Sequence, residues 1–134
     1  MGNYEAMLSF ELVKKILGHA GVSLDRLALD WASASEAPVF VDLITAFTRR
    51  IKELGPLGQA EGLDKDELRL KLSAAREAVK SVKLRMRFGK LAGEMRQEND
   101  YSPEAIEAKI EERAHEAILK EMDKQESALR TQGA

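Results

Sequence analysis

Apolar residues recur at helical spacing near the start of the chain, over residues 4–20. The apolar face is wide, which predicts a helix that is buried on more than one side. Gly21 follows at the position where a glycine in the left-handed conformation ends a helix. The residues that carry the repeat are Met7, Leu8, Phe10, Leu12, Val13, Ile16 and Leu17.

The pattern changes from helical spacing to alternation over residues 27–32, where Leu27, Leu29 and Trp31 alternate with smaller or polar residues. A period of two predicts a short β-strand. Because a single strand leaves backbone groups unpaired along both edges, it needs a partner. The partner would be a further strand of this chain, a second copy across a two-fold axis, or another polypeptide's sheet.

A strongly amphipathic helix is predicted next. Ser33 and Glu36 have the spacing of a capping box, but a start at Ser35 is favoured because it places Pro38 in the first turn, where its missing N–H costs no bond. Gly55-Pro56 ends the helix. Its apolar stripe is Phe40, Leu43, Ile44, Phe47, Ile51 and Leu54.

Two further helices are predicted after a linker at residues 59–63. The first opens at an Asp64 N-cap and carries an apolar seam from Leu68 to Met86, with a bend or break expected at Arg87–Lys90 because Gly89 and Gly93 weaken it. The second opens at Ser102-Pro103 and runs to Ala128, with residues 124–134 expected to fray.

The pattern therefore predicts a mainly α fold of about four helices with one short β-strand. We expect residues 1–58 to form the residual half of an α/β domain (helix, strand, helix). Residues 59–63 would be a linker, and residues 64–134 a helical hairpin or extension.

The composition excludes several kinds of catalytic and metal site. The chain has 134 residues, enough for one domain, and no cysteine. A disulfide, a thiolate nucleophile, Cys-ligated zinc and a Cys-ligated iron–sulfur cluster are thus excluded within the chain. No apolar run is long enough to cross a membrane and no signal peptide is visible, so a soluble cytoplasmic protein without a membrane partner is expected.

The net charge of −2 conceals a division along the chain. Residues 64–97 carry ten basic and five acidic residues (+5), whereas residues 98–134 carry five and ten (−5). One run holds five cations and no acid: Lys80, Lys83, Arg85, Arg87 and Lys90. Two interpretations stay open: a docking surface for an acidic partner, or a solvated face neutralised by the acidic last helix. Nucleic acid is disfavoured, since no aromatic platform accompanies the run.

Other candidate sites are weaker. Glu112 and His115 have the Glu-x-x-His spacing of di-iron bundles, but the second such motif is missing, so a polar helix face is favoured. His19 is expected to interact with the end of its helix. Ser33, Ser35 and Glu36 are explained by capping, because no partnering base or nucleophile elbow appears.

Several residues resemble the second half of the delta, or iron–sulfur, subunit of methyl-viologen-reducing hydrogenases. They are Gly2-Asn3-Tyr4, Gly21-Val22, Arg26-Leu27, Trp31-Ala-Ser-Ala-Ser-Glu36, Phe40 and Leu54-Gly55-Pro56, with a weaker likeness at Leu84-Arg85-Met86-Arg87. Members of that family bind a [2Fe–2S] cluster and pass electrons between a hydrogenase or formate dehydrogenase and heterodisulfide reductase in anaerobes. The resemblance covers roughly residues 2–96 and is best in residues 2–58.

The resemblance also implies a departure from the family, whose cysteines lie upstream of the position of Gly2-Asn3. No cluster ligand can be carried over, so no cofactor is expected in this chain. The chain is then expected to be a split or trimmed descendant, or a fragment, that lacks the cysteine-bearing N-terminal half.

We therefore predict a subunit of a hydrogenase/heterodisulfide-reductase-type electron-transfer complex that is non-catalytic by itself and acts as a structural adaptor toward other redox subunits. The alternative is a stand-alone homo-oligomeric helical protein without a redox role. The candidate interface residues are Leu27, Leu29, Trp31, Phe40, Lys80, Lys83, Arg85, Arg87 and Lys90.

Overall fold

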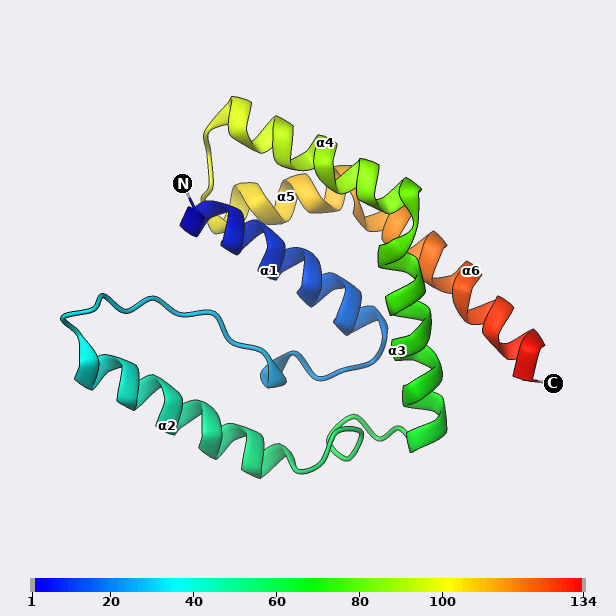
Figure 1. The fold of residues 1–134 in the computed structure, drawn as a ribbon, viewed down its shortest axis with the longest axis horizontal. Coiled ribbons are helices and arrows are strands. Elements are labelled where there is room, and N and C mark those ends of the chain that lie inside the picture. Colours follow the sequence, from blue (N-terminus) through cyan, green and yellow to red (C-terminus); the bar gives the residue numbers. More distant parts are fainter. Residues whose placement is uncertain (1, 134) are drawn as a thin grey trace.

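The computed structural model describes residues 2–133, which form six α-helices and one 3-10 turn (Figure 1). Helices α1, α3, α4, α5 and α6 pack together, while α2 lies apart beside a long extended segment. The elements are α1 (Gly2–His19), η1 (Leu24–Arg26), α2 (Ala37–Leu54), α3 (Lys65–Lys80), α4 (Val82–Glu98), α5 (Pro103–Arg113) and α6 (His115–Gly133).

The prediction of about four helices with one β-strand is wrong, because residues 2–133 contain six helices and no strand. The segment at residues 27–32 is extended, as its alternation suggests, and Leu27 has β-region angles (φ −119°, ψ 141°). Within the described residues, no second extended segment forms a ladder of backbone hydrogen bonds with it. Alternation thus predicts the local conformation but not the pairing that defines a strand.

The predicted third helix divides at Ser81 rather than at Arg87–Lys90. Ser81 is extended (φ −65°, ψ 140°), and its side chain accepts a hydrogen bond from the Leu84 N–H at 3.2 Å, which caps the start of α4. Gly89 lies inside α4 without a break. A serine side chain can accept a hydrogen bond from the backbone, and here Ser81 does so at the point where one helix stops and the next begins.

The predicted last helix also divides, at Ala114 (φ −126°, ψ −28°), and it continues to Gly133 instead of ending at Ala128. Residues 124–133 thus belong to α6, and the fraying of residues 124–134 stays a prediction; residue 134 lies outside the described part. Contacts with α3 hold this end: Lys71 lies 3.4 Å from Glu126, and Arg130 pairs with Glu67. These ion pairs add to the packing of α6 on α3, which is the most extensive between any two helices of residues 2–133.

Most other helix ends follow their sequence signals. Gly21 has a φ of 93° and closes α1 with the two hydrogen bonds of a Schellman motif. Asp64 and Ser102 cap α3 and α5 through their side chains. Helix α2 differs slightly: it begins at Ala37 with Glu36 at the N-cap position, so neither Ser33 nor Ser35 is its N-cap.

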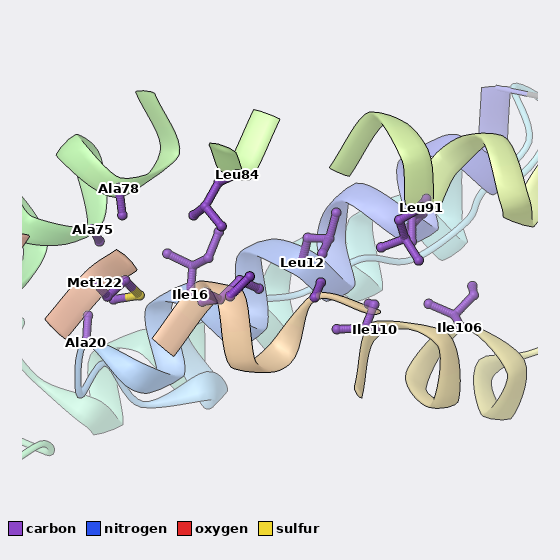
Figure 2. Close-up of a cluster of buried hydrophobic side chains, with 14 of the residues drawn as sticks. Leu12, Ile16, Ala20, Ala75, Ala78, Leu84, Leu91, Ile106, Ile110 and Met122 are labelled. Carbon is purple, nitrogen blue, oxygen red and sulfur yellow. The ribbon is translucent and has the colours of Figure 1, made fainter. Parts of the chain in front are cut away.

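The hydrophobic core is formed by side chains of α1, α3, α4, α5 and α6 (Figure 2). Leu91 of α4 points toward Ile106 and Ile110 of α5, and Leu84 lies beside Ile16 of α1. Fully buried side chains of this kind each contribute roughly 2 kcal/mol of transfer free energy. The core residues are Leu8, Leu12, Ile16, Ala20, Ala75, Ala78, Leu84, Leu91, Met95, Ile106, Ile110, Ala114, Ala117, Ile118 and Met122.

Helix α1 therefore shares one core with residues 75–122, and α2 contributes no residue to it. The division into residues 1–58, 59–63 and 64–134 stays a prediction. The packing shows a difference within residues 1–58: α1 is anchored in the bundle and α2 is not.

A buried ion pair fixes the position of α2. The Arg26 Nε lies 2.7 Å from a Glu61 carboxylate oxygen, and the two side chains are 10% and 1% exposed. Arg26 also donates to the carbonyls of Gly55 (2.9 Å) and Pro56 (3.0 Å), just beyond the C-terminus of α2. One guanidinium thus joins η1, the end of α2 and the following loop, and it satisfies carbonyls that would otherwise lack donors.

Glu61 is held by more than Arg26. Its carboxylate also accepts the backbone N–H groups of Ser23 (2.9 Å) and Gly58 (3.0 Å). The charge-assisted hydrogen bond from Arg26, helped by these two N–H groups, lowers the pKa of Glu61 from 4.5 to about 2. The native fold therefore favours the ionised carboxylate, and this contribution to stability is present above about pH 4.5 and is lost as the pH falls toward 2.

We predict that Glu61→Gln lowers the free energy of unfolding by about 3 kcal/mol at pH 7, because it leaves a buried guanidinium without its counter-charge. Urea denaturation monitored by circular dichroism measures the loss. The difference between wild type and variant should stay constant above about pH 5 and shrink below it, since wild-type Glu61 itself becomes protonated. Glu53→Gln, on the exposed side of α2, is the matched control; an equal loss in both variants would contradict the assignment.

Candidate interaction site

Helix α2 presents an apolar face that the rest of the described chain does not cover. None of its residues is buried, although it carries the cleanest apolar stripe in the sequence. Phe40 is 57% exposed and Ile44 is 50% exposed. Single exposed apolar side chains are ordinary on protein surfaces, but a contiguous row along one helix marks a surface for interaction.

The extended segment at residues 27–32 lies beside α2 and has two different faces. Leu29 and Trp31 line a small hollow together with Met7 and Phe10 of α1. Ala28, Asp30 and Ala32 instead line a groove with α2. The alternation in the sequence thus separates a large apolar face that meets α1 from a small-residue face that borders the groove.

The groove between this segment and α2 has a volume of about 530 Å³. That size falls within the range of ligand pockets, but the groove follows an exposed helical stripe, as a polypeptide-binding site does. Arg50 supplies the only basic group among its lining residues. They are Ala28, Asp30, Ala32, Phe40, Leu43, Ile44, Ala46, Phe47 and Arg50.

A tight turn shapes the end of the groove where α2 begins. The Glu36 carboxylate accepts the Ser33 N–H at 2.8 Å, and the Glu36 N–H donates to the Ser33 carbonyl at 2.9 Å. The hydrogen bond from the Ser33 backbone lowers the pKa of Glu36 below its ordinary value. The Ser33/Glu36 spacing therefore makes half of a capping box, one turn ahead of the helix.

The predicted interface residues fall into three places. Phe40 lines the groove, whereas Trp31 and Leu29 lie on the far face of the extended segment, where Trp31 is 49% exposed. Leu27 lies near the start of that segment beside Leu24 and Phe10. The five cations lie elsewhere, at the end of α3 and along α4. The structure therefore brings only part of the predicted set together.

The basic run is exposed and is not neutralised by the acidic last helix. Among residues 2–133, Lys80 pairs only with its neighbour Glu77 (3.4 Å), and Lys83, Arg85, Arg87 and Lys90 make no ion pair. Acidic residues of α5 and α6 instead pair with α1 and α3: Lys15 with Glu111, His19 with Asp123, and Lys71 with Glu126.

The residues present do not fit a [2Fe–2S] cluster of the Cys-ligated kind, because the sequence holds no cysteine. Within residues 2–133, no group of three or more histidine, aspartate or glutamate side chains has the arrangement to hold a metal ion. Glu112 and His115 belong to different helices, and His115 instead lies 3.7 Å from Glu111.

The helices of the described chain are also too short or too polar to span a bilayer. None of those within residues 2–133 combines the length and the apolar character that a membrane crossing requires.

The sequence did not predict the residues that hold α2 in place, nor the exposure of the residues that line the groove. Arg26 appeared only as part of the family resemblance, and Glu61 gave no signal at all within the glycine-rich linker. Leu43, Ile44 and Phe47 were predicted as an apolar stripe, but a stripe indicates burial without saying against what. Their exposure is visible only in the fold.

Comparison with known proteins places the similarity in the part of the chain that carries the groove. Residues 1–55 match the family model described as methyl-viologen-reducing hydrogenase, delta subunit. This matched segment comprises α1, η1, the extended segment and α2. No solved structure matches the chain.

Two curated relatives share the same part of the chain. Over 55 residues the chain is 40% identical to the iron-sulfur subunit of the F420-non-reducing hydrogenase of Archaeoglobus profundus, covering 41% of this chain and 40% of that protein. Over 57 residues it is 35% identical to the matching subunit of the ferredoxin:CoB-CoM heterodisulfide reductase of Methanosarcina mazei, covering 42% of this chain and 7% of that protein. The chain thus spans well under half the length of the relatives that it matches.

Proposed function

We propose that this chain is a structural component of an electron-transfer complex of the hydrogenase and heterodisulfide reductase type, and that it binds a redox subunit through the groove and the exposed face of α2. The observation that carries the proposal is the uncovered apolar stripe of α2, which lies within the segment similar to subunits of such complexes. The proposed role is that of an adaptor, which positions the electron carriers of other chains without holding one.

The large accessible surface of the chain supports the proposal that a partner covers part of it. Its accessible surface is 8872 Å², whereas a compact monomer of 14.9 kDa exposes roughly 7,000 Å². The excess exceeds the roughly 800 Å² that each partner contributes to an interface of standard size. Binding over the groove would remove much of this excess from water, with Phe40 and Ile44 as apolar anchors at its centre.

The composition of the groove favours a protein partner over a small ligand. Its lining is apolar except for Asp30 and Arg50, and these two charges lie on opposite walls, one on the extended segment and one on α2. An apolar centre with a few polar groups at the rim is the usual anatomy of a protein interface. A cysteine-bearing redox subunit is the proposed occupant, because this chain has no cluster ligand of its own.

The first test is Phe40→Asp/Ile44→Asp. Both side chains are at least half exposed, so the double variant should fold with an unchanged melting temperature. Tagged full-length protein would be co-expressed with each of the two relatives, the heterodisulfide reductase subunit from Methanosarcina mazei and the hydrogenase iron-sulfur subunit from Archaeoglobus profundus. Affinity purification and light scattering follow complex formation. We expect wild type to form a stoichiometric complex with at least one of these probes, and the variant to bind at least tenfold more weakly.

Thr45→Asp/Thr48→Asp, on the polar side of α2, is the matched control and should bind like wild type. A stable monomer with both probes would contradict the proposal. So would a homodimer that the Phe40/Ile44 variant dissociates, because the groove would then be occupied by a second copy of this chain.

The second test concerns the absence of a cluster. After anaerobic reconstitution with ferrous iron and sulfide, we expect the purified chain to retain far less than one iron per molecule and to lack visible absorption, since no thiolate is present to bind iron. Iron analysis and absorption spectroscopy measure this, with the hydrogenase iron-sulfur subunit treated in parallel as the positive control. Stoichiometric iron with a visible charge-transfer band would overturn the adaptor role.

A further inference from the structure

Helix α4 has an outward face whose apolar side chains are largely exposed. Val82 is 70% exposed and Met86 is 71% exposed, the highest values among the large apolar side chains. Gly89 and Gly93 continue the same face at steps of three and four residues. The opposite face carries Leu84, Leu91 and Met95, which are buried in the core.

The two glycines leave space rather than filling it. A Cβ added at Gly89 or Gly93 would meet no atom within 4 Å, so the packing of this chain does not require a glycine at either position. Glycine is also a poor residue for a helix interior, because it gives up the most backbone freedom. What it allows on an exposed face is the close approach of another backbone.

Cations flank the apolar centre of this face on both sides. Successive residues of an α-helix are about 100° apart around its axis. Lys83 and Lys90 therefore lie on one flank of the face, with Arg87 farther round on the same side, and Arg85 lies on the other flank. These four make no ion pair within residues 2–133. Both acidic residues of α4 form ion pairs with α5 instead, Glu94 with Arg113 (3.2 Å) and Glu98 with Lys109 (2.6 Å).

We propose that the Val82–Gly93 face of α4 binds an acidic amphipathic helix of a protein partner. A narrow apolar stripe of the partner helix would pack on Val82 and Met86, and the two helix backbones would come closest at Gly89. Acidic residues on both sides of that stripe would pair with the cations of α4. The charge of the face argues for this occupant, because unneutralised cations on both flanks select an acidic partner and repel a basic one.

Two other occupants fit less well. A membrane surface would require a broader apolar face, and here two glycines stand where an interfacial helix carries large apolar side chains. The acidic last helix of this chain is engaged elsewhere, because Asp123 pairs with His19 and Glu126 with Lys71. The proposal concerns a surface separate from the α2 groove, so either one can fail without the other.

The test uses full-length protein and two labelled helical peptides that share one leucine/alanine stripe, flanked by glutamate in one and by lysine in the other. Fluorescence anisotropy measures binding at about 0.1 M salt. We expect the acidic peptide to bind at least tenfold more tightly than the basic one, and its affinity to fall as the salt concentration rises. Equal binding of both peptides, or binding of neither, would overturn the proposal.

The decisive variant is Gly89→Leu/Gly93→Leu. Leucine is the better helix former, so the melting temperature should stay the same or rise, while the added bulk should weaken binding of the acidic peptide at least tenfold. Ala108→Leu/Ala128→Leu, at exposed positions on α5 and α6, is the matched control and should bind like wild type. Unchanged binding by the glycine variant would overturn the proposal.

Two further measurements separate the other occupants. Sedimentation velocity would overturn the proposal if wild type dimerises and the glycine variant does not, since the face would then bind a second copy. Tighter binding to phosphatidylserine vesicles than to the acidic peptide would overturn it in favour of a membrane surface.

Discussion

The buried pair of Arg26 and Glu61 is the interaction on which the shape of this molecule depends. Helix α2 has no residue in the core, so its position rests on the few groups at its C-terminal end. Arg26 holds the carbonyls of Gly55 and Pro56, and Glu61 holds Arg26 together with the Ser23 and Gly58 N–H groups. A pair of this kind stabilises little compared with apolar packing, but it fixes geometry, because an unpaired charge at the same place would be costly.

Local signals in the sequence predict the helices well and their arrangement poorly. The ends at Gly21 and Gly55 and the caps at Asp64 and Ser102 follow from backbone chemistry within a few residues, which is why they were predicted correctly. The predicted strand failed because a strand is defined by its neighbour, and alternation says nothing of a neighbour. The break lies at Ser81 and not near Gly89, because a serine that caps a helix start determines the break here more strongly than glycines in a helix interior.

The same distinction explains what could be predicted of the site. The apolar stripe of α2 and the run of cations are visible as patterns, but each pattern has two outcomes, burial or exposure, that depend on the rest of the fold. In α1 the apolar residues Leu8, Leu12 and Ile16 are buried in the core, whereas in α2 a cleaner stripe is left uncovered. Glu61 could not be predicted, because its role comes from Arg26, which is 35 residues away in the sequence.

The segment similar to known proteins therefore does two different things in this structure. Its first helix, α1, packs into a bundle built mostly from residues beyond the matched segment, and its second helix, α2, lies apart from that bundle. The bundle needs α1 for its core, so it anchors the segment and leaves α2 free to present its apolar face. In the heterodisulfide reductases, the similar stretch of 57 residues belongs to a far longer chain. The outer helix of the bundle, α4, carries a second exposed surface, in which cations that are unpaired within residues 2–133 flank the apolar side chains of Val82 and Met86.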